Sequence, residues 1–215
     1  MIEIKNFMKS RILIALILLL NGCASNKEKL ISHADELESH HSFGVCSGYG
    51  CKNYQKTGLS DAQWQDIESI FNVNTISAEG EREMIARAIA LIEQMVGPKT
   101  GTDNDKAQAT IINLNTEGQM DCIDEAFNTS TYLYLLRQDG LIKLHTLGKP
   151  IRRNFNVLSY PHSTASIHEI STNEHFTVDS WFHQNGALAE IIPAKTWMGP
   201  WYPEEKKERY NFSTS

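Results

Sequence analysis

The amino-acid sequence predicts an α+β domain in which helices come first and an antiparallel sheet follows. Apolar residues recur at helical spacing in the first half of the chain, and strand-like segments dominate the second half. Two of those segments flank a polar turn, which favours a hairpin. This order of elements favours an α+β domain over a doubly wound parallel sheet. About 190 residues follow the first 22, which is enough for one domain with its own core.

The first 22 residues are typical of an export signal. Basic side chains precede an apolar run from Ile12 to Leu20, and Leu20-Asn21-Gly22-Cys23 follows. The run is about half of the roughly 20 residues that cross a bilayer, so a permanent transmembrane helix is less favoured. The last four residues resemble the lipobox of bacterial lipoproteins. The resemblance implies cleavage before Cys23 and attachment of acyl groups, such as palmitate, to that cysteine; an ordinary secretory signal is the alternative.

Residues 23–43 are expected to form a charged, lipid-anchored tether, and residues 44–215 a single domain. As a flexible coil, the tether would span about 25 Å. The lipid bilayer is then one partner of the protein. Ala24-Ser25 after the cysteine favours the outer membrane over inner-membrane retention, so we expect an envelope protein that faces the periplasm.

The mature chain is acidic, because loss of residues 1–22 changes the formal net charge from −6 to −8 through removal of Lys5, Lys9, Arg11 and Glu3. No cluster of basic residues is present in the sequence. Binding of nucleic acid requires such a cluster to neutralise phosphates, so nucleic acid is not an expected partner.

The remaining cysteines differ in their surroundings. Cys46 and Cys51 are separated by Ser47-Gly48-Tyr49-Gly50, whose small residues allow the tight turn of a short disulfide loop. A zinc site would need a second pair of ligands, and the sequence has no second Cys pair. Cys122 is then an unpaired thiol, either reactive or buried and inert.

The first helix of the domain is expected to begin near Ser60. Ser60 can cap this helix, Gln63 stands at the capping-box position, and Leu59 can pack against Trp64 as a hydrophobic staple.

Two further helices are expected before the strands. One runs from about Ala78 to Val96, where Gly97-Pro98 is expected to end it. Residues 97–109 have no periodicity and predict a loop long enough to be functional. The other helix is expected from about Cys122 to Arg137, with Gly140 beyond its end.

Strands are expected in the remainder of the domain. The hairpin turn is expected at residues 171–174, and the strand-like segments are Leu141–Leu147, Phe155–Tyr160, His162–Ile170 and His175–Phe182.

Three residues have positions that suit thiol chemistry. Cys122 lies at a helix start, where the helix dipole and free N–H groups favour the thiolate. His162 begins a strand and could accept the thiol proton, and Asp179 near the end of the next strand could orient the imidazole. A turn centred on Thr172-Asn173 pairs His162 with His183, which leaves Asp179 on the same face but about 13 Å away. A bulge or a longer turn is needed to bring His162 and Asp179 together.

The segment Asp121-Cys122-Ile123-Asp124-Glu125-Ala126, with His162 and then Val178-Asp179-Ser180, forms a recognisable pattern. It resembles the transglutaminase-like superfamily, and within it the bacterial transglutaminase-like cysteine proteases. The resemblance covers about residues 78–185, which would be the core of the domain. It implies a papain-like fold with the cysteine at a helix start and the histidine and aspartate on successive strands.

The resemblance also implies roles for these residues. Cys122 would be the nucleophile, His162 the base and then the acid, and Asp179 the group that holds the tautomer of the imidazole. The Cys122 backbone N–H would be an oxyanion donor. Gln119 is a candidate side-chain donor, although its spacing to Cys122 does not follow that of papain-type enzymes.

No cofactor is expected, although calcium is considered because some proteases of this group bind it beside the cysteine. Asp121 and Asp124 are weak candidates, since Ile123 replaces an acidic residue that is often found there. An alternative metal site would combine some of His168, His175 and His183 with Asp179.

Aromatic residues follow the proposed triad along the chain. Trp181 and Phe182 are expected to shield the histidine and aspartate or to fill the core. A C-terminal strap over the core, or a ligand platform, is expected from Trp197, Trp201 and Tyr202.

These features together predict a membrane-anchored thiol hydrolase, a cysteine peptidase or amidase that acts through a thioacyl intermediate. A protein or peptide is the expected substrate. Three alternatives remain open: a non-catalytic binding lipoprotein in which Cys122 is inert, a cell-wall peptide hydrolase, and a protein-crosslinking acyltransferase.

Overall fold

The computed structural model describes residues 39–72, 77–109, 116–154, 161–205 and 207–212. The signal segment, Cys23 and the strand expected at Phe155–Tyr160 lie outside these residues. Within the described ranges, no helix has the length and apolar character needed to cross a membrane.

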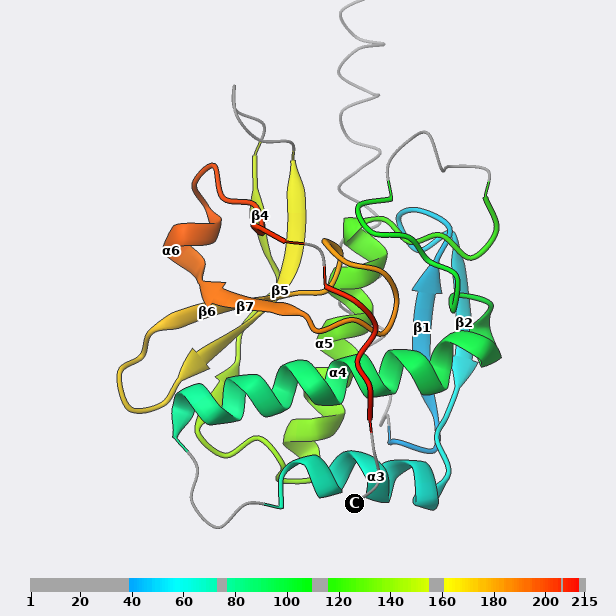
Figure 1. Cartoon of the computed structure of the whole chain (residues 1–215), viewed down its shortest axis with the longest axis horizontal. Coiled ribbons are helices and arrows are strands. Elements are labelled where there is room, and N and C mark those ends of the chain that lie inside the picture. The colour runs from blue at the N-terminus through cyan, green and yellow to red at the C-terminus, as the bar shows by residue number, and fades with distance from the viewer. Residues whose placement is uncertain (1–38, 73–76, 110–115, 155–160, 206, 213–215) are drawn as a thin grey trace, which may run out of the picture. The chain divides into compact units, whose positions relative to one another are not determined.

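The described chain is an α+β domain with antiparallel sheets, as the sequence predicted (Figure 1). Three helices, α3, α4 and α5, precede the five-stranded sheet in the chain. The elements are β1 (Phe43–Ser47), β2 (Asn53–Thr57), α3 (Asp61–Ile70), α4 (Ala78–Thr100), α5 (Cys122–Gln138), β3 (His145–Leu147), β4 (Ile151–Arg153), β5 (His162–Glu169), β6 (His175–Asp179), β7 (Glu190–Pro193) and α6 (Ala194–Trp197).

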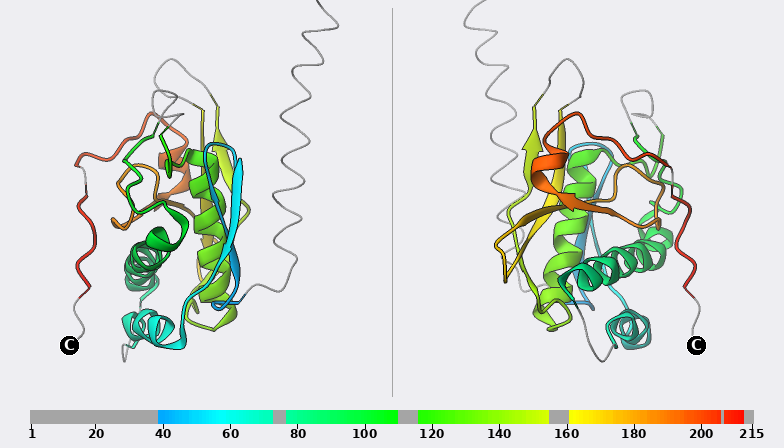
Figure 2. Two further views of the ribbon diagram at one scale, coloured as in Figure 1. Left: turned by 90° about the vertical axis from the view of Figure 1, so that its right-hand side faces the viewer. Right: turned by 60° about the vertical axis from the view of Figure 1, so that its left-hand side comes forward.

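Helix α5 lies between the two sheets (Figure 2). One side of α5 packs against β1 of the β1–β2 hairpin, and another packs against β5 in the five-stranded sheet. Helix α4 runs across α5, and α3 packs beside α4 (Figure 1). The core between these elements includes Phe43, Val45, Trp64, Ile67, Ile85, Ile89, Ile92, Tyr132, Leu133, Leu136, Ala165, Ile167 and Val178.

The helix boundaries follow local capping rules, with one correction. Ser60 and Gln63 form the predicted capping box at the start of α3. The prediction that α4 ends at Gly97-Pro98 was wrong, because the helix continues through both residues to Thr100. The residue that ends it is Gly101, whose φ of 76° is in the left-handed region that glycine adopts at little cost.

The hairpin formed by β1 and β2 was not predicted as secondary structure. Strand β2 has the polar sequence Asn-Tyr-Gln-Lys-Thr, and most of it is exposed, so it lacks the alternation that marks a half-buried strand. Phe43 in β1 is buried in the core. The domain packing therefore includes Phe43, which the sequence had placed in the tether.

The five-stranded sheet has β5 at its centre. Strands β3 and β4 pair with the two halves of one edge of β5, β6 pairs with its other edge, and β7 pairs with β6. Strand β3 is shorter than expected because the chain after α5 first turns through Gly140, where Leu141 N–H donates to the Leu136 carbonyl. Strand β6 ends at Asp179 rather than at Phe182.

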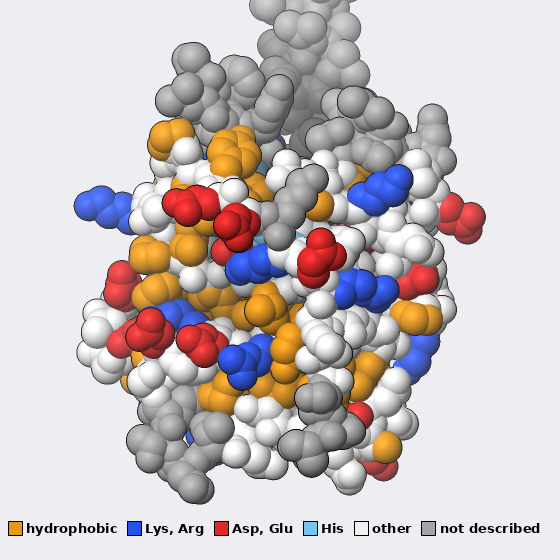
Figure 3. Space-filling model, in the orientation of Figure 1, with side chains coloured by type: hydrophobic (Ala, Val, Ile, Leu, Met, Phe, Trp, Pro, Cys, Tyr) orange, Lys and Arg blue, Asp and Glu red, His pale blue; other side chains and the backbone are white. Residues whose placement is uncertain are grey.

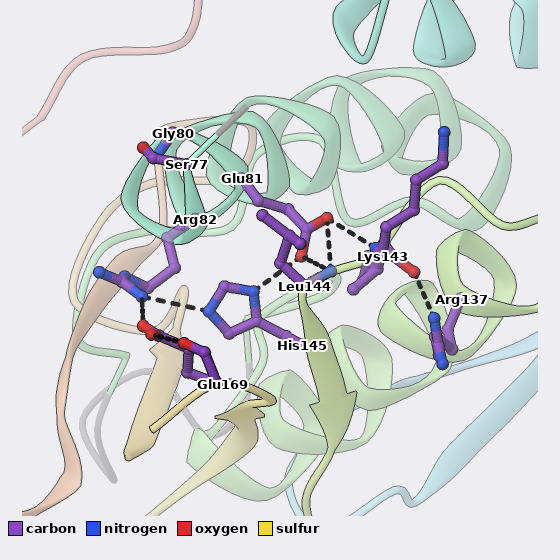
Figure 4. Close-up of polar contacts among 11 residues, drawn as sticks. Ser77, Gly80, Glu81, Arg82, Arg137, Lys143, Leu144, His145 and Glu169 are labelled. Carbon is purple, nitrogen blue, oxygen red and sulfur yellow. Dashed lines mark hydrogen bonds and ion pairs between the residues drawn. The ribbon is translucent and has the colours of Figure 1, made fainter. Parts of the chain in front are cut away.

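A buried polar cluster joins the start of α4 to β3 and β5 (Figure 4). The Glu81 carboxylate accepts from the backbone N–H groups of Lys143 and Leu144 and lies 2.7 Å from Nδ1 of His145. Burial acts to raise the pKa of Glu81, but these hydrogen bonds outweigh it, so the pKa is lowered. Arg82 extends the cluster through an ion pair of 2.9 Å with Glu169.

The surface facing the viewer in Figure 3 carries acidic and basic side chains in a mixed arrangement. Lys and Arg do not gather into a patch on this face.

Candidate active site

Cys122 is the first residue of α5, at the helix start that the sequence predicted. Asp121 caps this helix by accepting hydrogen bonds from the backbone N–H groups of Ile123 and Asp124. The N–H of Cys122 itself belongs to the first turn, where N–H groups have no acceptor within the helix. The position of Cys122 therefore suits a nucleophile, and its backbone N–H suits an oxyanion donor.

The disulfide loop fastens to the same end of α5. Cys46 and Cys51 are joined, which confirms the predicted bridge. The Asp124 carboxylate accepts from the N–H groups of Tyr49 and Cys51 in this loop. One turn further along α5, the Asn128 amide accepts from Cys46 N–H at 2.7 Å and donates to Cys46 C=O at 3.0 Å. The hairpin thus fixes the position of the helix start that carries Cys122.

His162 and Asp179 are in contact, with Nε2 of the imidazole 2.7 Å from Oδ2 of the carboxylate. Ala165 pairs with Val178, and continuing this register by one residue puts Asp179 opposite Thr164, two residues from His162. Such diagonal neighbours on one face are about 7–8 Å apart, within reach of their side chains. The predicted pairing of His162 with His183 was wrong, because the pairing is centred one residue earlier than expected.

A shell of aromatic rings encloses this pair. The ring centroids of Trp181, Phe182 and Trp197 lie 4.5, 5.2 and 5.4 Å from that of His162. Trp197 Nε1 also donates to Asp179 Oδ2 at 2.7 Å. Both His162 and Asp179 are only 2% exposed, so their hydrogen bond is shielded from water.

The other imidazole nitrogen of His162, Nδ1, is buried and has no hydrogen-bond partner within the described ranges. A buried nitrogen without a partner costs free energy, and a catalytic role is one of the reasons for which proteins keep such a group. Asp179 therefore fixes one nitrogen of His162 and leaves the other free to exchange a proton.

The Cys122 thiol lies beside the start of β5. The backbone N–H of Ser163, the residue after His162, hydrogen-bonds to the Cys122 sulfur. Burial nevertheless raises the pKa of Cys122 to about 11, and the negative charges of Asp121 and Asp179 add to the rise. The expectation that the helix start favours the thiolate is thus outweighed, and thiolate formation requires a nearby proton acceptor.

Arg153 contacts the aromatic shell. It is 2% exposed, and its guanidinium donates to the backbone carbonyls of Trp197 and Trp201 at 3.0 Å. Its charge also lies over the rings of Trp197 and Tyr202. The C-terminal strap expected from the sequence is therefore attached to β4 beside the site.

Buried acidic residues connect α5 to the end of β6. Glu125 accepts a hydrogen bond of 2.6 Å from the Ser180 hydroxyl, which also contacts Thr129. Burial and the charges of neighbouring carboxylates raise the pKa of Glu125 to about 7. The same causes raise the pKa of Asp105 to about 9 and raise that of Glu93. Glu125 is thus linked to Ser180, the residue that follows Asp179.

The remaining predicted site residues have other partners. The Gln119 side chain is 1% exposed and binds the loop after α4, donating to Asn104 C=O and accepting from Lys106 N–H. Asp121 and Asp124, the weak calcium candidates, accept backbone N–H groups at the helix start and in the disulfide loop. Burial and the charge of Asp121 nevertheless raise the pKa of Asp124 to about 7, although the backbone hydrogen bonds act to lower it.

The histidines of the alternative metal site have separate partners. The rings of His168 and His175 stack at 4.1 Å on paired strands, whereas His183 Nε2 contacts Glu190 at 2.7 Å. Asp179 contacts His162 and Trp197. In the described structure, these four residues therefore do not share one set of contacts.

Three residues that support the site were not predicted from the sequence: Ser163, Arg153 and the Trp197 indole. Arg153 and Ser163 each have polar neighbours in their strands, and no local pattern distinguishes them from those neighbours. Trp197 was recognised as part of a strap, but its hydrogen bond to Asp179 depends on the pairing of β6 with β7.

No protein family, curated protein or solved structure matches this chain.

Proposed function

We propose that the protein is a thiol hydrolase, a cysteine peptidase or amidase whose triad is Cys122, His162 and Asp179. One observation carries the proposal: His162 binds Asp179 through Nε2 at 2.7 Å, while its buried Nδ1 lacks a partner among the described residues. The Ser163 contact brings the Cys122 sulfur to the residue next to His162. A buried imidazole oriented by a carboxylate suits proton transfer during nucleophilic attack.

In the proposed reaction, the Cys122 sulfur attacks a carbonyl carbon while His162 takes the thiol proton. The carbon–nitrogen bond then breaks, and His162 gives that proton to the departing amine, which leaves a thioester on Cys122. Water attacks the thioester, His162 accepts a proton from the water, and the carbon–sulfur bond breaks. The acid product leaves and the proton returns to the sulfur. Asp179 stabilises the imidazolium that forms in each half of the reaction.

The fold and cellular location are part of the same proposal. Helix α5, which begins with the cysteine, packs against a strand that begins with the histidine, an arrangement compatible with the papain-like, transglutaminase-like fold. The sequence before the domain supports a lipoprotein anchored through Cys23 in the cell envelope, facing the periplasm. The disulfide is in keeping with that oxidising compartment. Protein or peptide substrates are proposed, with no cofactor.

Alkylation of Cys122 by iodoacetamide tests the proposal. With the pKa of Cys122 at about 11, an isolated thiol would react slowly at pH 7 and about tenfold faster for each added pH unit. If His162 accepts the proton, labelling at pH 7 will be faster than this trend, and His162→Ala will restore the trend. His168→Ala, a change further along β5, will leave the rate unchanged. Equal rates for the native protein and His162→Ala at pH 7 would refute the proposal.

A non-catalytic binding lipoprotein is the second candidate. The raised pKa of Cys122 favours it, because a thiol that stays protonated is inert. In that case labelling at pH 7 is slow in the native protein and insensitive to His162. Labelling that depends on His162 but is not accompanied by hydrolysis of a peptide library would instead indicate an acyltransferase. Addition of a primary amine as acceptor would reveal that activity.

A further inference from the structure

A second group of polar side chains lies away from the candidate active site, where the domain begins. It consists of His40 and His41, which precede β1, and Asp61, the first residue of α3. One Asp61 oxygen, Oδ1, lies 3.4 Å from Nε2 of His40 and 3.3 Å from Nε2 of His41. Within the described ranges, this is the one group of three or more His, Cys, Asp or Glu side chains whose ligand atoms all lie within 4.8 Å of one another.

The distances in this group are longer than those of three other histidine–carboxylate contacts, although the His40–Asp61 contact is within hydrogen-bond range. Three other pairs in the protein, His145–Glu81, His162–Asp179 and His183–Glu190, are each 2.7 Å apart. At 3.3–3.4 Å, the Asp61 contacts are longer than the roughly 2.7–2.9 Å of a charge-assisted hydrogen bond. Bonds of about 2.0–2.1 Å to a tetrahedral zinc ion place neighbouring ligand atoms about 3.3–3.4 Å apart. The observed separations therefore match two edges of a zinc coordination tetrahedron.

The second nitrogen of His40 has the partner that a metal ligand commonly has. His40 Nδ1 lies 3.4 Å from Oδ2 of Asp139, the residue that caps the end of α5. Histidines that bind metal through one nitrogen usually donate the other N–H to a carboxylate, which fixes the tautomer and the ring orientation. Asp139 faces the nitrogen at which that carboxylate is expected, although at 3.4 Å it lies farther away than in a direct hydrogen bond.

The histidines are also held in place before any ion binds. The His40 ring stacks on buried Trp64, with centroids 4.9 Å apart and planes within 9° of parallel. The His40 carbonyl accepts a hydrogen bond from Leu59 N–H at 2.6 Å. Gly58 passes so close that a side chain there would meet the His41 carbonyl at 1.9 Å. A site with ordered ligands loses less conformational entropy on binding than a flexible one.

We propose that His40, His41 and Asp61 bind one zinc ion, with His40 oriented by Asp139 and a water molecule or an external ligand in the fourth position. Two imidazoles and a carboxylate form a donor set that zinc accepts, and the exposure of His41 and Asp61 leaves the ion accessible. The ion would connect the start of the domain to α3. It would also connect both, through Asp139, to the end of α5. The site does not depend on the proposed hydrolase activity.

Calorimetric titration of the full, tag-free chain with ZnCl₂ tests the site, carried out on a Cys122→Ala background so that the thiol cannot bind the ion. One zinc ion per chain is expected. His41→Ala and Asp61→Asn should each weaken zinc binding by at least tenfold. Asp139→Asn should weaken it by about 10–100-fold without changing the stoichiometry, as carboxylates that orient metal-bound histidines do. X-ray absorption should give zinc–nitrogen and zinc–oxygen distances of about 2.0–2.2 Å.

A matched control is His175→Ala, which removes one ring of the other neighbouring histidine pair, His168 and His175. Zinc affinity should not change in this variant. Absence of saturable zinc binding, or equal loss of binding in His175→Ala and His41→Ala, would overturn the proposal. Circular dichroism of each variant distinguishes loss of a ligand from loss of the fold, and His41→Ala, an exposed position, is expected to remain folded.

Discussion

At the scale of single residues, Trp197 is the side chain that links the aromatic shell to the chemistry. It is fully buried and donates to the same Asp179 oxygen that contacts His162. Two contacts on one carboxylate oxygen hold Asp179 in one orientation. That orientation in turn selects which nitrogen of His162 is left free.

Replacement of Trp197 by Phe should therefore slow Cys122 alkylation at pH 7 and any hydrolysis that depends on it. A hydrogen bond to a charged group contributes about 1.5–3 kcal/mol, so the rate should fall by about ten- to a hundredfold. Trp201→Phe is the control, because Arg153 contacts the Trp201 backbone carbonyl, which the substitution keeps. A Trp197→Phe variant that is folded and fully reactive would show that this hydrogen bond has no role.

The residues at the site differ in how far sequence could predict them. Cys122, His162 and Asp179 follow from local rules, since a helix start, a strand start and a hairpin partner are each visible in the sequence. The Ser163 and Trp197 contacts depend on packing between segments distant in sequence. The shift in the pKa of Cys122 could not be predicted either, because its direction depends on burial and on the charge of Asp179.

At the scale of elements, a polar side chain of α5 hydrogen-bonds the backbone of the neighbouring hairpin. Asn128 is the clearest case: it is 2% exposed and satisfies both the N–H and the C=O of Cys46. The β1–β2 hairpin is thereby attached to the helix that carries Cys122.

Asn128→Ala should lower the free energy of unfolding by about 2–4 kcal/mol, because it leaves two buried backbone groups unsatisfied at roughly 1–3 kcal/mol each. Urea denaturation followed by far-UV circular dichroism measures the change. Tyr134→Ala, an exposed position on the same helix, should change stability by less than about 0.5 kcal/mol. Similar losses in both variants would contradict the assignment.

Glu81→Gln tests the attachment of α4 to β3. Glu81 is paired with buried His145. Removing one partner of a buried ion pair leaves the other uncompensated and lowers the free energy of unfolding by about 3–5 kcal/mol. The pKa of Glu81 is lowered in the folded protein, so its contribution is present above the unfolded pKa and is lost as the pH falls through the folded pKa. The variant should therefore lose less stability on acidification than the native protein does.

The control for Glu81→Gln is Glu83→Gln, on the same helix, whose ion pair with Arg87 is exposed and 3.6 Å long. Exposed pairs of this kind contribute about 0.3–0.5 kcal/mol. If Glu81→Gln did not change the loss of stability at low pH, other groups would have to account for that loss.

The elements themselves were predictable in proportion to their local signals. Helices α3 and α5 have recognisable caps. The start of α3 and both ends of α5 were predicted close to their observed positions. Strands β2, β4 and β7 are only 5, 3 and 4 residues long. They become strands because a neighbour pairs with them, and a single sequence carries little information on that pairing.

At the scale of the whole molecule, three buried acidic residues of the described chain affect how stability depends on pH. Glu93, Asp105 and Glu125 come from α4, the following loop and α5, and all three have raised pKa values. An acidic group with a raised pKa in the folded state retains its proton there after the unfolded chain has lost it. The folded state then binds more protons, so stability falls as the pH rises.

The protein should therefore become less stable between about pH 4.5, where an unfolded glutamate ionises, and pH 7, where Glu125 ionises in the folded state. Asp105 extends this loss toward pH 9. Urea denaturation at intervals from pH 5 to pH 9 measures it, and Glu125→Gln should flatten the part of the profile below pH 7. Glu174→Gln, at the exposed hairpin, should reproduce the native profile; a native profile that rises through this range would contradict the assignment.

The pairing of β5 with β6 also limits where residues can be inserted between His162 and Asp179. His162 and Asp179 share a face because side chains alternate along each strand, with a period of two residues. One residue inserted between His162 and the paired segment would turn the imidazole to the opposite face. Two would keep its face but move it about 6.6 Å along the strand. Between His162 and Asp179, insertions that preserve this contact are therefore confined to the turn at residues 170–173, where added residues leave the β5–β6 pairing unchanged.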